Sequence, residues 1–159
     1  MSIKIPIFYH ESYDLPLLSR SAFRKWDCSS ESSGFDLYAA IDEDLTLEPM
    51  HRVVIPHGFS LIIPRGHEGQ IRPRSGLAAK HGITVLNSPG TIDAGYRGEV
   101  KTILINLNFR GNFVIKKGMR ISQLVFSPDL NVELVEITKN EFDKEVSERG
   151  SGGFGSTGE

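Results

Sequence analysis

The stretch Gly90-Thr91-Ile92-Asp93-Ala94-Gly95-Tyr96-Arg97-Gly98-Glu99 follows Asn87-Ser88-Pro89 and leads into the apolar run at residues 100–107. Its glycines frame an acid, an aromatic residue and a base. Glycine allows turns with positive φ and lets a ligand approach the backbone closely. The pattern predicts a strand, a tight turn and a returning strand, with Asp93 and Tyr96 at the mouth of a hairpin. A plain surface turn carrying a solvated acid is the alternative interpretation.

Size and composition place the chain among ordinary globular proteins. It has 159 residues, of which 39% are hydrophobic and 24% charged, so a single domain with a real core is expected. The net charge is −2, whereas general nucleic-acid binders are usually strongly basic, and no nucleic-acid partner is expected. A polyanionic ligand would therefore need a local cluster of Arg and Lys.

Cysteine content and hydropathy bear on where the protein works. Cys28 is the single cysteine, which excludes an internal disulfide and a cysteine-based zinc site. The start of the chain lacks the apolar core of a signal peptide. Because no apolar run approaches a membrane span, no membrane partner is expected either. We therefore expect the protein to be cytoplasmic.

Short apolar and β-branched segments, broken by Gly and Pro, predict an all-β sandwich or barrel. In one of them, Phe35, Leu37 and Ala39 should share one face, with Asp36 on the other. A single short helix is predicted at 75–82, with Ser75 as N-cap and Gly82 as its stop. The expected strands are residues 3–8, 33–40, 51–56, 58–64, 100–107, 116–125 and 131–137.

Polar residues beside these elements are candidates for ligand contacts. Arg74 offers a fork-shaped cation and Ser75 a hydroxyl where a helix begins, which favours an anion. The alternative is that Ser75 simply caps the helix and Arg74 is a surface charge. Gln123 enters an apolar strand, where such a residue is mostly a satisfied core or edge group. Asp36 by itself is most simply a solvent-facing strand residue.

The chain ends in Arg149-Gly150-Ser151-Gly152-Gly153-Phe154-Gly155-Ser156-Thr157-Gly158-Glu159, a composition that cannot hold a fixed shape unaided. It nearly spells a phosphate-binding P-loop but lacks the lysine and has no room for the following helix. A flexible terminus is one interpretation. Arg149 and Phe154 favour another, an arm that supplies a phosphate ligand and a stacking ring. We expect a β domain over residues 1–138 and a linker with a flexible, glycine-rich arm over 139–159.

Taken together, five stretches resemble the five motifs of the trimeric all-β dUTP pyrophosphatases, the dUTPases, across residues 33–158. They are Gly34-Phe35-Asp36-Leu37-Tyr38-Ala39, Pro73-Arg74-Ser75-Gly76-Leu77-Ala78, residues 90–99, residues 118–124 and residues 149–158. Each is weak alone, but five in the right order are specific. The resemblance implies a homotrimer of jelly-roll-like subunits with shared active sites. It also implies cleavage of dUTP to dUMP and pyrophosphate with Mg2+, which would limit uracil in DNA and supply dUMP for thymidylate synthesis.

The resemblance implies roles for individual residues. Asp93 would be the general base that directs a water at the α-phosphorus, and Tyr96 would lie under the deoxyribose and exclude a 2′-hydroxyl. Since aspartate is a weak base, Asp93 would act by holding water in line. Asn87, Thr91, Ile92 and Lys101 would line the uracil pocket. Arg74, Ser75, Gly76 and Gln123 would meet the phosphates and the attacking water.

The remaining implied roles concern the metal and the arm. Asp36 would act on Mg2+ through water. Arg149 would hold the γ-phosphate, Phe154 would cover the uracil, and Gly155 would be a further substrate contact. Ordering a backbone residue costs roughly 1–2 kcal/mol, so a glycine-rich arm should close only over a bound nucleotide.

Two other functions stay open from the sequence. A dCTP deaminase of the same superfamily is also trimeric, but it needs a different catalytic acid and lacks this Arg-and-Phe ending. A β-sandwich trimer that binds a nucleotide or a regulatory partner without catalysis is the second. The presence of Asp93 and of the glycine-rich tail favours the dUTPase.

Overall fold

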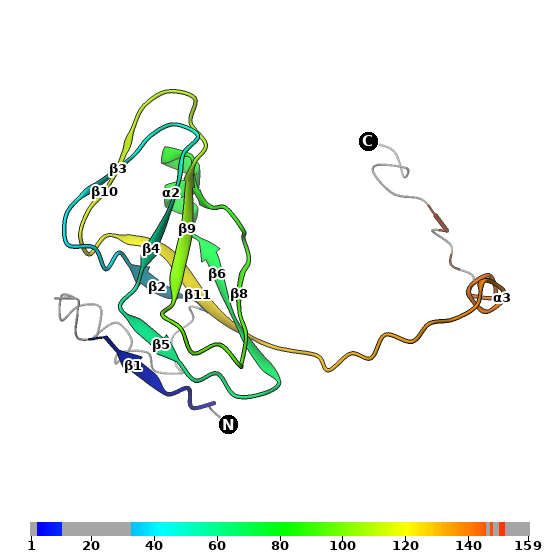
Figure 1. The fold of residues 1–159 in the computed structure, drawn as a ribbon. Helices are drawn as coiled ribbons and strands as arrows, with labels where there is room; N and C mark the ends of the chain where they lie inside the picture. The colour runs from blue at the N-terminus through cyan, green and yellow to red at the C-terminus, as the bar shows by residue number, and fades with distance from the viewer. Residues whose placement is uncertain (1–2, 11–32, 146, 148–149, 152–159) are drawn as a thin grey trace.

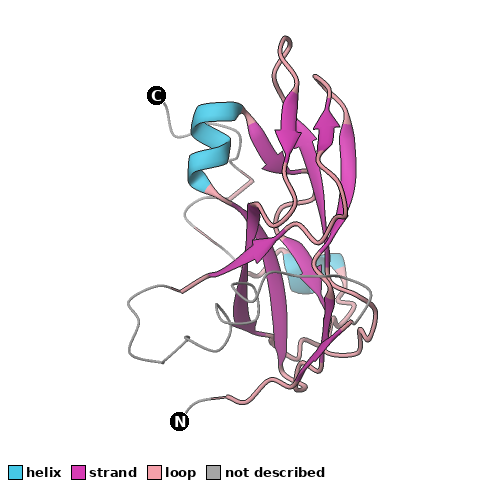
Figure 2. Cartoon of the chain, turned by 90° about the vertical axis from the view of Figure 1, so that its left-hand side faces the viewer, coloured by secondary structure: helices cyan, strands magenta, loops and turns pink. Residues whose placement is uncertain are grey.

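The computed structural model describes residues 3–10, 33–145, 147 and 150–151, and these form a strand-rich body with two short helices (Figures 1 and 2). The all-β prediction is therefore confirmed. The helices are α2 (Ser75–His81) and α3 (Lys139–Phe142). The strands are β1 (Ile7–Tyr9), β2 (Phe35–Tyr38), β3 (Leu45–Leu47), β4 (Arg52–Pro56), β5 (Phe59–Leu61), β6 (His67–Pro73), β7 (Ile83–Val85), β8 (Gly90–Ile92), β9 (Lys101–Asn106), β10 (Phe113–Ile115) and β11 (Arg120–Pro128).

Two sheets of antiparallel strands carry the fold. One has the order β2-β11-β6-β8 and the other the order β4-β9-β7. Two further ribbons pair β1 with β5 and β10 with β3. None of the described pairings joins two consecutive strands, so the chain crosses repeatedly between sheets, as a jelly-roll requires. This topology brings β2, β6 and β11, which are far apart in sequence, side by side.

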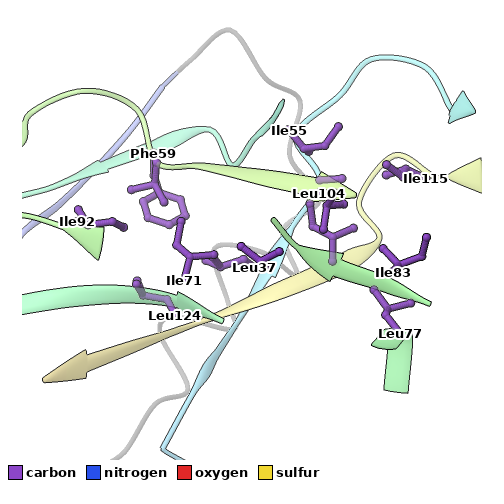
Figure 3. Packing of buried hydrophobic residues seen from close by; sticks show 14 of the residues in the cluster. Leu37, Ile55, Phe59, Ile71, Leu77, Ile83, Ile92, Leu104, Ile115 and Leu124 are labelled. Carbon is purple, nitrogen blue, oxygen red and sulfur yellow. The ribbon is translucent and has the colours of Figure 1, made fainter. Parts of the chain in front are cut away.

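The core lies between these sheets, and alternation along each strand supplies it. Leu37, Leu104 and Leu124 come from β2, β9 and β11 and have no exposed surface. Figure 3 shows these side chains meeting Ile71 of β6 in one apolar cluster. Leu37 and Ala39 are fully buried, which confirms the face predicted for that strand. Truncating such a leucine to alanine typically costs 2–5 kcal/mol, so this cluster fixes the fold.

The hairpin predicted around Asp93 is wrong. Strand β8, which precedes Asp93, pairs with β6, whereas β9 pairs with β4 and β7. The loop between β8 and β9 therefore crosses from one sheet to the other. Sequence pattern could not show this, because two short apolar runs around a glycine-rich turn look the same whether or not they pair.

The helix prediction is confirmed in position and corrected in its cap. Gly82 ends α2 with a left-handed φ of 59°, and its N–H donates to the carbonyls of Ala78 and Leu77. The N-cap, however, is Arg74, and Ser75 is the first helical residue. A second helix, α3, begins after Thr138, which forms a capping box with Glu141. Within the described ranges, no helix has the length and apolar character needed to cross a membrane.

The strand predicted at residues 131–137 is not formed in this chain. After β11 the backbone runs outward in extended form to α3, clear of the body (Figure 1). Its apolar side chains are largely exposed, among them Leu130 at 79% and Leu134 at 94%. The apolar pattern suits a strand, but a strand needs a neighbour, and this segment pairs with none in the described part of the chain.

Candidate functional site

A pocket of about 240 Å3 lies beside β8 and the loop that follows it. It is lined by six residues that were expected to contact the nucleoside or the attacking water, whereas Phe154, the other expected uracil contact, lies outside the described residues. These six residues are Asn87, Thr91, Ile92, Asp93, Tyr96 and Lys101. Among the described strands, β8 pairs with β6 alone, so its other edge keeps free backbone donors and acceptors. A free strand edge beside a pocket can read the polar edge of a planar base.

The loop at the pocket mouth is held in shape by its own hydrogen bonds. The N–H of Tyr96 donates to the carbonyl of Asp93 over 3.0 Å, which closes a turn. The Tyr96 hydroxyl donates to the carbonyl of Glu99, also over 3.0 Å. The ring then lies against Gly98, where any Cβ would collide with it. Gly98 thus leaves the space that the end of the tyrosine ring occupies, and Tyr96 and Asp93 are both exposed.

Glu99 is a site residue whose role the sequence did not reveal. Its side chain is 15% exposed, and Oε1 accepts a hydrogen bond from the Gly58 N–H over 2.9 Å. Its other oxygen lies 3.8 Å from the Lys101 ammonium, which also lines the pocket. Glu99 therefore ties the loop to the segment after β4 and partly neutralises the pocket's cation.

A second cluster lies where β2 and β11 adjoin the end of β6. The Arg74 Nε donates to Asp36 Oδ1 over 3.0 Å, and the Arg120 Nη1 donates to Asp36 Oδ2 over 2.9 Å. Arg74 also donates to the carbonyl of Arg120 over 3.1 Å. One carboxylate thus holds two guanidinium groups together. Arg120 was not singled out from the sequence, although it lies within the fourth motif.

Gln123, Ser75 and Gly76 adjoin this cluster. Gln123 lies opposite Asp36 in the β2–β11 pairing, and its amide donates to the carbonyl of Pro73 over 2.9 Å. Gly34 leaves the space that the Gln123 carboxamide occupies, because a Cβ there would collide with Oε1. Ser75 and Gly76 open α2 and are exposed. The alternative view of Gln123, a satisfied edge residue, describes its contacts in the single chain equally well.

The two clusters lie toward opposite ends of β6. Asp93 follows Ile92, which pairs with Gly69, whereas Arg74 follows Pro73 at the other end. At about 3.3 Å per residue, the strand between Gly69 and Pro73 alone spans roughly 13 Å, and Asp93 and Arg74 lie beyond those two residues. Within one chain, the structure therefore does not bring Asp93 to the Arg74–Ser75 group.

The described residues hold no group of three or more His, Cys, Asp or Glu side chains that could enclose a metal ion. Mg2+ usually keeps several waters and binds through one or two carboxylates plus substrate phosphates. Asp36, about one-third exposed and paired with the guanidinium groups of Arg74 and Arg120, fits such a water-mediated contact. It does not form a metal cage by itself.

Arg149, Phe154 and Gly155 lie outside the residues that the structure describes. Of the region 139–159, the structure describes α3 and a few residues after it. The expected boundary at residue 138 and the expected closing arm accordingly remain predictions.

The family model and the curated relatives that match this chain all point to one family. The family model for dUTPase matches residues 27–158. The deoxyuridine 5′-triphosphate nucleotidohydrolase of Wolbachia pipientis wMel is 54% identical over 130 residues, which cover 82% of this chain and 83% of the relative. The protein of the same name from Rhizobium etli CIAT 652 is 54% identical over 132 residues, covering 82% of this chain and 81% of the relative.

Solved structures show the same fold. A mutant of the Staphylococcus bacteriophage 80alpha dUTPase with dUpNHpp superimposes with a TM-score of 0.75 at 25% identity, covering 99% of this chain and 100% of that chain. A mutant dUTPase from phage phi11 of S. aureus, described with a structural Mg(II) ion, has a TM-score of 0.68 at 23% identity, covering 86% of this chain and 98% of that one.

Proposed function

The chain belongs to the dUTPase family, and from that membership we propose that it hydrolyses dUTP to dUMP and pyrophosphate with Mg2+. Water adds to the α-phosphorus, the bond from that phosphorus to the β-phosphate oxygen breaks, and pyrophosphate leaves. The reaction would limit uracil in DNA and supply dUMP for thymidylate synthesis. The observation that carries the proposal is the pocket beside β8, where Asp93 and Tyr96 lie beside a strand edge that pairs with no other described strand.

The nucleoside end of the substrate would occupy this pocket. The free edge of β8 around Thr91 and Ile92, together with Asn87 and the Lys101 backbone, would pair with the polar edge of uracil. Cytosine inverts part of that pattern and would leave buried polar groups unpaired, at about 1–3 kcal/mol each. The exposed ring of Tyr96 would lie under the deoxyribose, where a 2′-hydroxyl would collide with it.

The phosphate end would be held by the second cluster. A nucleoside triphosphate carries about four negative charges, and guanidinium groups bind phosphate in a bidentate, charge-assisted way. Arg74 is already oriented by Asp36, and the exposed Ser75 and Gly76 lie directly after it. Mg2+, when bound to the phosphates and reached by Asp36 through water, would offset further negative charge and favour departure of pyrophosphate.

Asp93 and Gln123 would handle the attacking water. The carboxylate of Asp93 would accept its proton and hold it in line with the α-phosphorus, so positioning contributes more than basicity. Gln123 would orient the same water. Its amide is already fixed on the carbonyl of Pro73, at the phosphate cluster.

These assignments support a homotrimer with shared active sites. Asp93 and Arg74 lie toward opposite ends of β6, so one chain would contribute the nucleoside pocket to one site and the phosphate cluster to another. The exposed apolar segment between β11 and α3 supports assembly too, since a neighbouring copy would cover Leu130 and Leu134. Residues 139–159 would then act as the arm that closes over a site, through Arg149, Phe154 and Gly155. The single cysteine supports a cytoplasmic location.

Pyrophosphate release, measured separately with dUTP, dTTP, dCTP and UTP and with or without Mg2+, tests the reaction. We expect release from dUTP alone among the four, stimulated by Mg2+. Release of ammonia from dCTP would instead identify a deaminase. Absence of turnover with every nucleotide would favour a binding protein.

Mixed assemblies test the shared site. Asp93→Asn and Arg74→Gln should each be nearly inactive, yet trimers co-assembled from equal amounts of both should regain about a quarter of wild-type activity, because that share of sites combines two intact halves. The matched control mixes Arg74→Gln with Gln123→Ala, two changes that lie in the same cluster. This mixture should regain no activity. Equal behaviour of the two mixtures would contradict the shared site.

A further inference from the structure

A buried chain of hydrogen bonds joins three strands beneath the site. His57 Nδ1 lies 2.7 Å from the carbonyl oxygen of Tyr38, at the end of β2. His57 Nε2 lies 2.7 Å from Thr102 Oγ1 in β9, and that oxygen lies 2.7 Å from Ser122 Oγ in β11. The three side chains are 2%, 1% and 0% exposed, respectively. Buried polar groups in a β-sandwich core demand an explanation.

The carbonyl of Tyr38 determines which atom donates and which accepts in each of these hydrogen bonds. A carbonyl oxygen accepts but never donates, so Nδ1 of His57 must carry the proton. Burial lowers the pKa of His57 to about 4, so the ring is neutral near pH 7 and Nε2 is an acceptor. The Thr102 hydroxyl then donates to Nε2 and accepts from the Ser122 hydroxyl. Each link thus has one defined donor.

Both hydroxyls lie next to groups that the proposed reaction uses. Ser122 directly precedes Gln123, and successive residues of a strand point to opposite faces. Holding Ser122 in the interior therefore directs Gln123 toward the second cluster, formed by Asp36, Arg74 and Arg120. Thr102 follows Lys101 and lines the nucleoside pocket.

The backbone hydrogen bonds between β11 and β2 are irregular next to Ser122. The pairing of β11 with β2 shifts register between Arg120 and Ser122, which marks a bulge. Bulges re-aim side chains and interrupt the ladder locally. Ser122 is the first residue after this irregularity, so its bond to Thr102 adds a constraint where the backbone ladder is interrupted.

We propose that His57 is a positioning residue for dUTP hydrolysis, which acts through Thr102 and Ser122 to set the orientation of Gln123 and the placement of β9 at the pocket. The proposal rests on the proposed function. Because His57 is buried, it would itself touch neither the substrate nor the attacking water. Its effect would be on how accurately the attacking water and the nucleotide are placed, where small displacements cost much rate.

Substitutions that delete members of the hydrogen-bond network test this proposal. Ser122→Ala and Thr102→Val each remove one hydroxyl and should lower kcat on the order of 10-fold. For Ser122→Ala, KM should stay within about twofold, because the affected group is Gln123 rather than the pocket. The double variant should lose little more kcat than either single variant, because the effects of residues in one hydrogen-bond network are not additive.

Two substitutions of His57 give a rescue comparison. Glutamine can place an acceptor where Nε2 stands and so retain the bond from Thr102, whereas asparagine reaches only the Nδ1 position. We expect His57→Gln to retain most of kcat and His57→Asn to lose as much as Thr102→Val. Equal kcat in the two variants would overturn the positioning role.

Asn106→Ala is the structural control. Asn106 is fully buried and donates to the carbonyls of Leu47 and Gly111, at the other end of β9 from Thr102. At a temperature where circular dichroism shows every variant fully folded, Asn106→Ala should leave kcat unchanged. If the control and the variants of His57, Thr102 and Ser122 lost kcat equally, the loss would reflect stability alone. That result would overturn the proposal.

The wild-type protein separates the two levels of inference. If it fails to release pyrophosphate from dUTP, the proposed function falls and the positioning role with it. If the wild type is active and the variants of Ser122, Thr102 and His57 have the same kcat, the positioning role alone is refuted. The 15N spectrum of the His57 ring at pH 7 tests the direction: a proton on Nδ1 is expected, and a proton on Nε2 would overturn it.

Discussion

The carboxylate of Asp36 holds Arg74, with Nε of the arginine 3.0 Å from Oδ1, before any substrate is present. Both side chains are partly exposed, at 33% and 27%, so the pair adds little to stability. Its value lies in keeping a flexible guanidinium in place, which reduces the entropy that phosphate binding must offset. Asp36 therefore connects the metal and phosphate contacts of the proposed site.

Asp36→Asn should weaken the response to Mg2+ more than it weakens the fold. Asparagine removes the charge and keeps one acceptor oxygen for the two guanidinium groups, so we expect the Mg2+ concentration at half-maximal activity to rise several-fold, with unfolding free energy changed by less than about 1 kcal/mol. Activity against Mg2+ concentration measures this. Asp44→Asn, which removes an equal charge from an exposed carboxylate bonded to the Lys117 N–H, is the control and should behave as wild type.

Asp93→Asn should abolish turnover and spare the structure. The side chain is exposed, so the melting temperature should stay unchanged, while kcat falls on the order of 100-fold or more. Steady-state pyrophosphate release and thermal unfolding provide the two measurements. A variant that retains more than half of wild-type kcat would remove Asp93 from the mechanism.

Tyr96→Ala should relax discrimination between dUTP and UTP. Without the ring, the space beside Gly98 opens and a 2′-hydroxyl can be accommodated, so the ratio of kcat/KM values for the two nucleotides should fall by at least about 10-fold. Tyr96→Phe is the matched control. It loses the bond to the Glu99 carbonyl but keeps the ring, and its discrimination should stay near wild type. An unchanged ratio in Tyr96→Ala would assign sugar selection to another group.

Ending the chain after Glu148 should leave assembly intact and nearly abolish turnover. The removed residues include Arg149 and Phe154, the proposed γ-phosphate and uracil contacts. Sedimentation should give the wild-type mass, and pyrophosphate release should fall on the order of 100-fold. Full activity of the truncated protein would refute the role of the arm.

Acid should destabilise the fold through His57. Its pKa is about 4 in the folded protein against 6.5 ordinarily, so the unfolded state takes up a proton first as pH falls. Stability is thus unaffected above about pH 6.5 and declines between 6.5 and 4, by about 3 kcal/mol in total. Urea unfolding at fixed protein concentration measures this. His57→Gln lacks this titration, so the wild type should lose more stability than the variant over that interval.

The sequence predicted the parts of the fold that depend on local pattern. Alternation placed Leu37 in the core, and Gly82 marked the end of α2 because a left-handed residue is needed there. Pairing was harder. The strands flanking Asp93 join different sheets, and that depends on which distant strand offers a better apolar face. The extended segment carrying Leu134 shows the same limit, since its pattern is that of a strand and it pairs with none of the strands that the structure describes.

The site was predictable by composition and less so by contact. The motif stretches contained Asp36, Arg74 and Gln123, but nothing local indicated that Asp36 bridges Arg74 to Arg120. His57 gave no signal, because its partners lie in β2 and β9, far along the chain. Such relationships arise from the stacking of strands, and a linear pattern does not encode them directly.

The outward course of residues 129–138 would give any copy that has not joined the proposed trimer a specific weakness. An extended segment with exposed apolar side chains and unpaired backbone groups is what proteases accept most readily. A cut there would release everything from α3 onward, including Arg149 and Phe154, from an otherwise intact body. In the proposed trimer, a chain cut in this way before assembly would still contribute its pocket but would bring no arm to a neighbouring site.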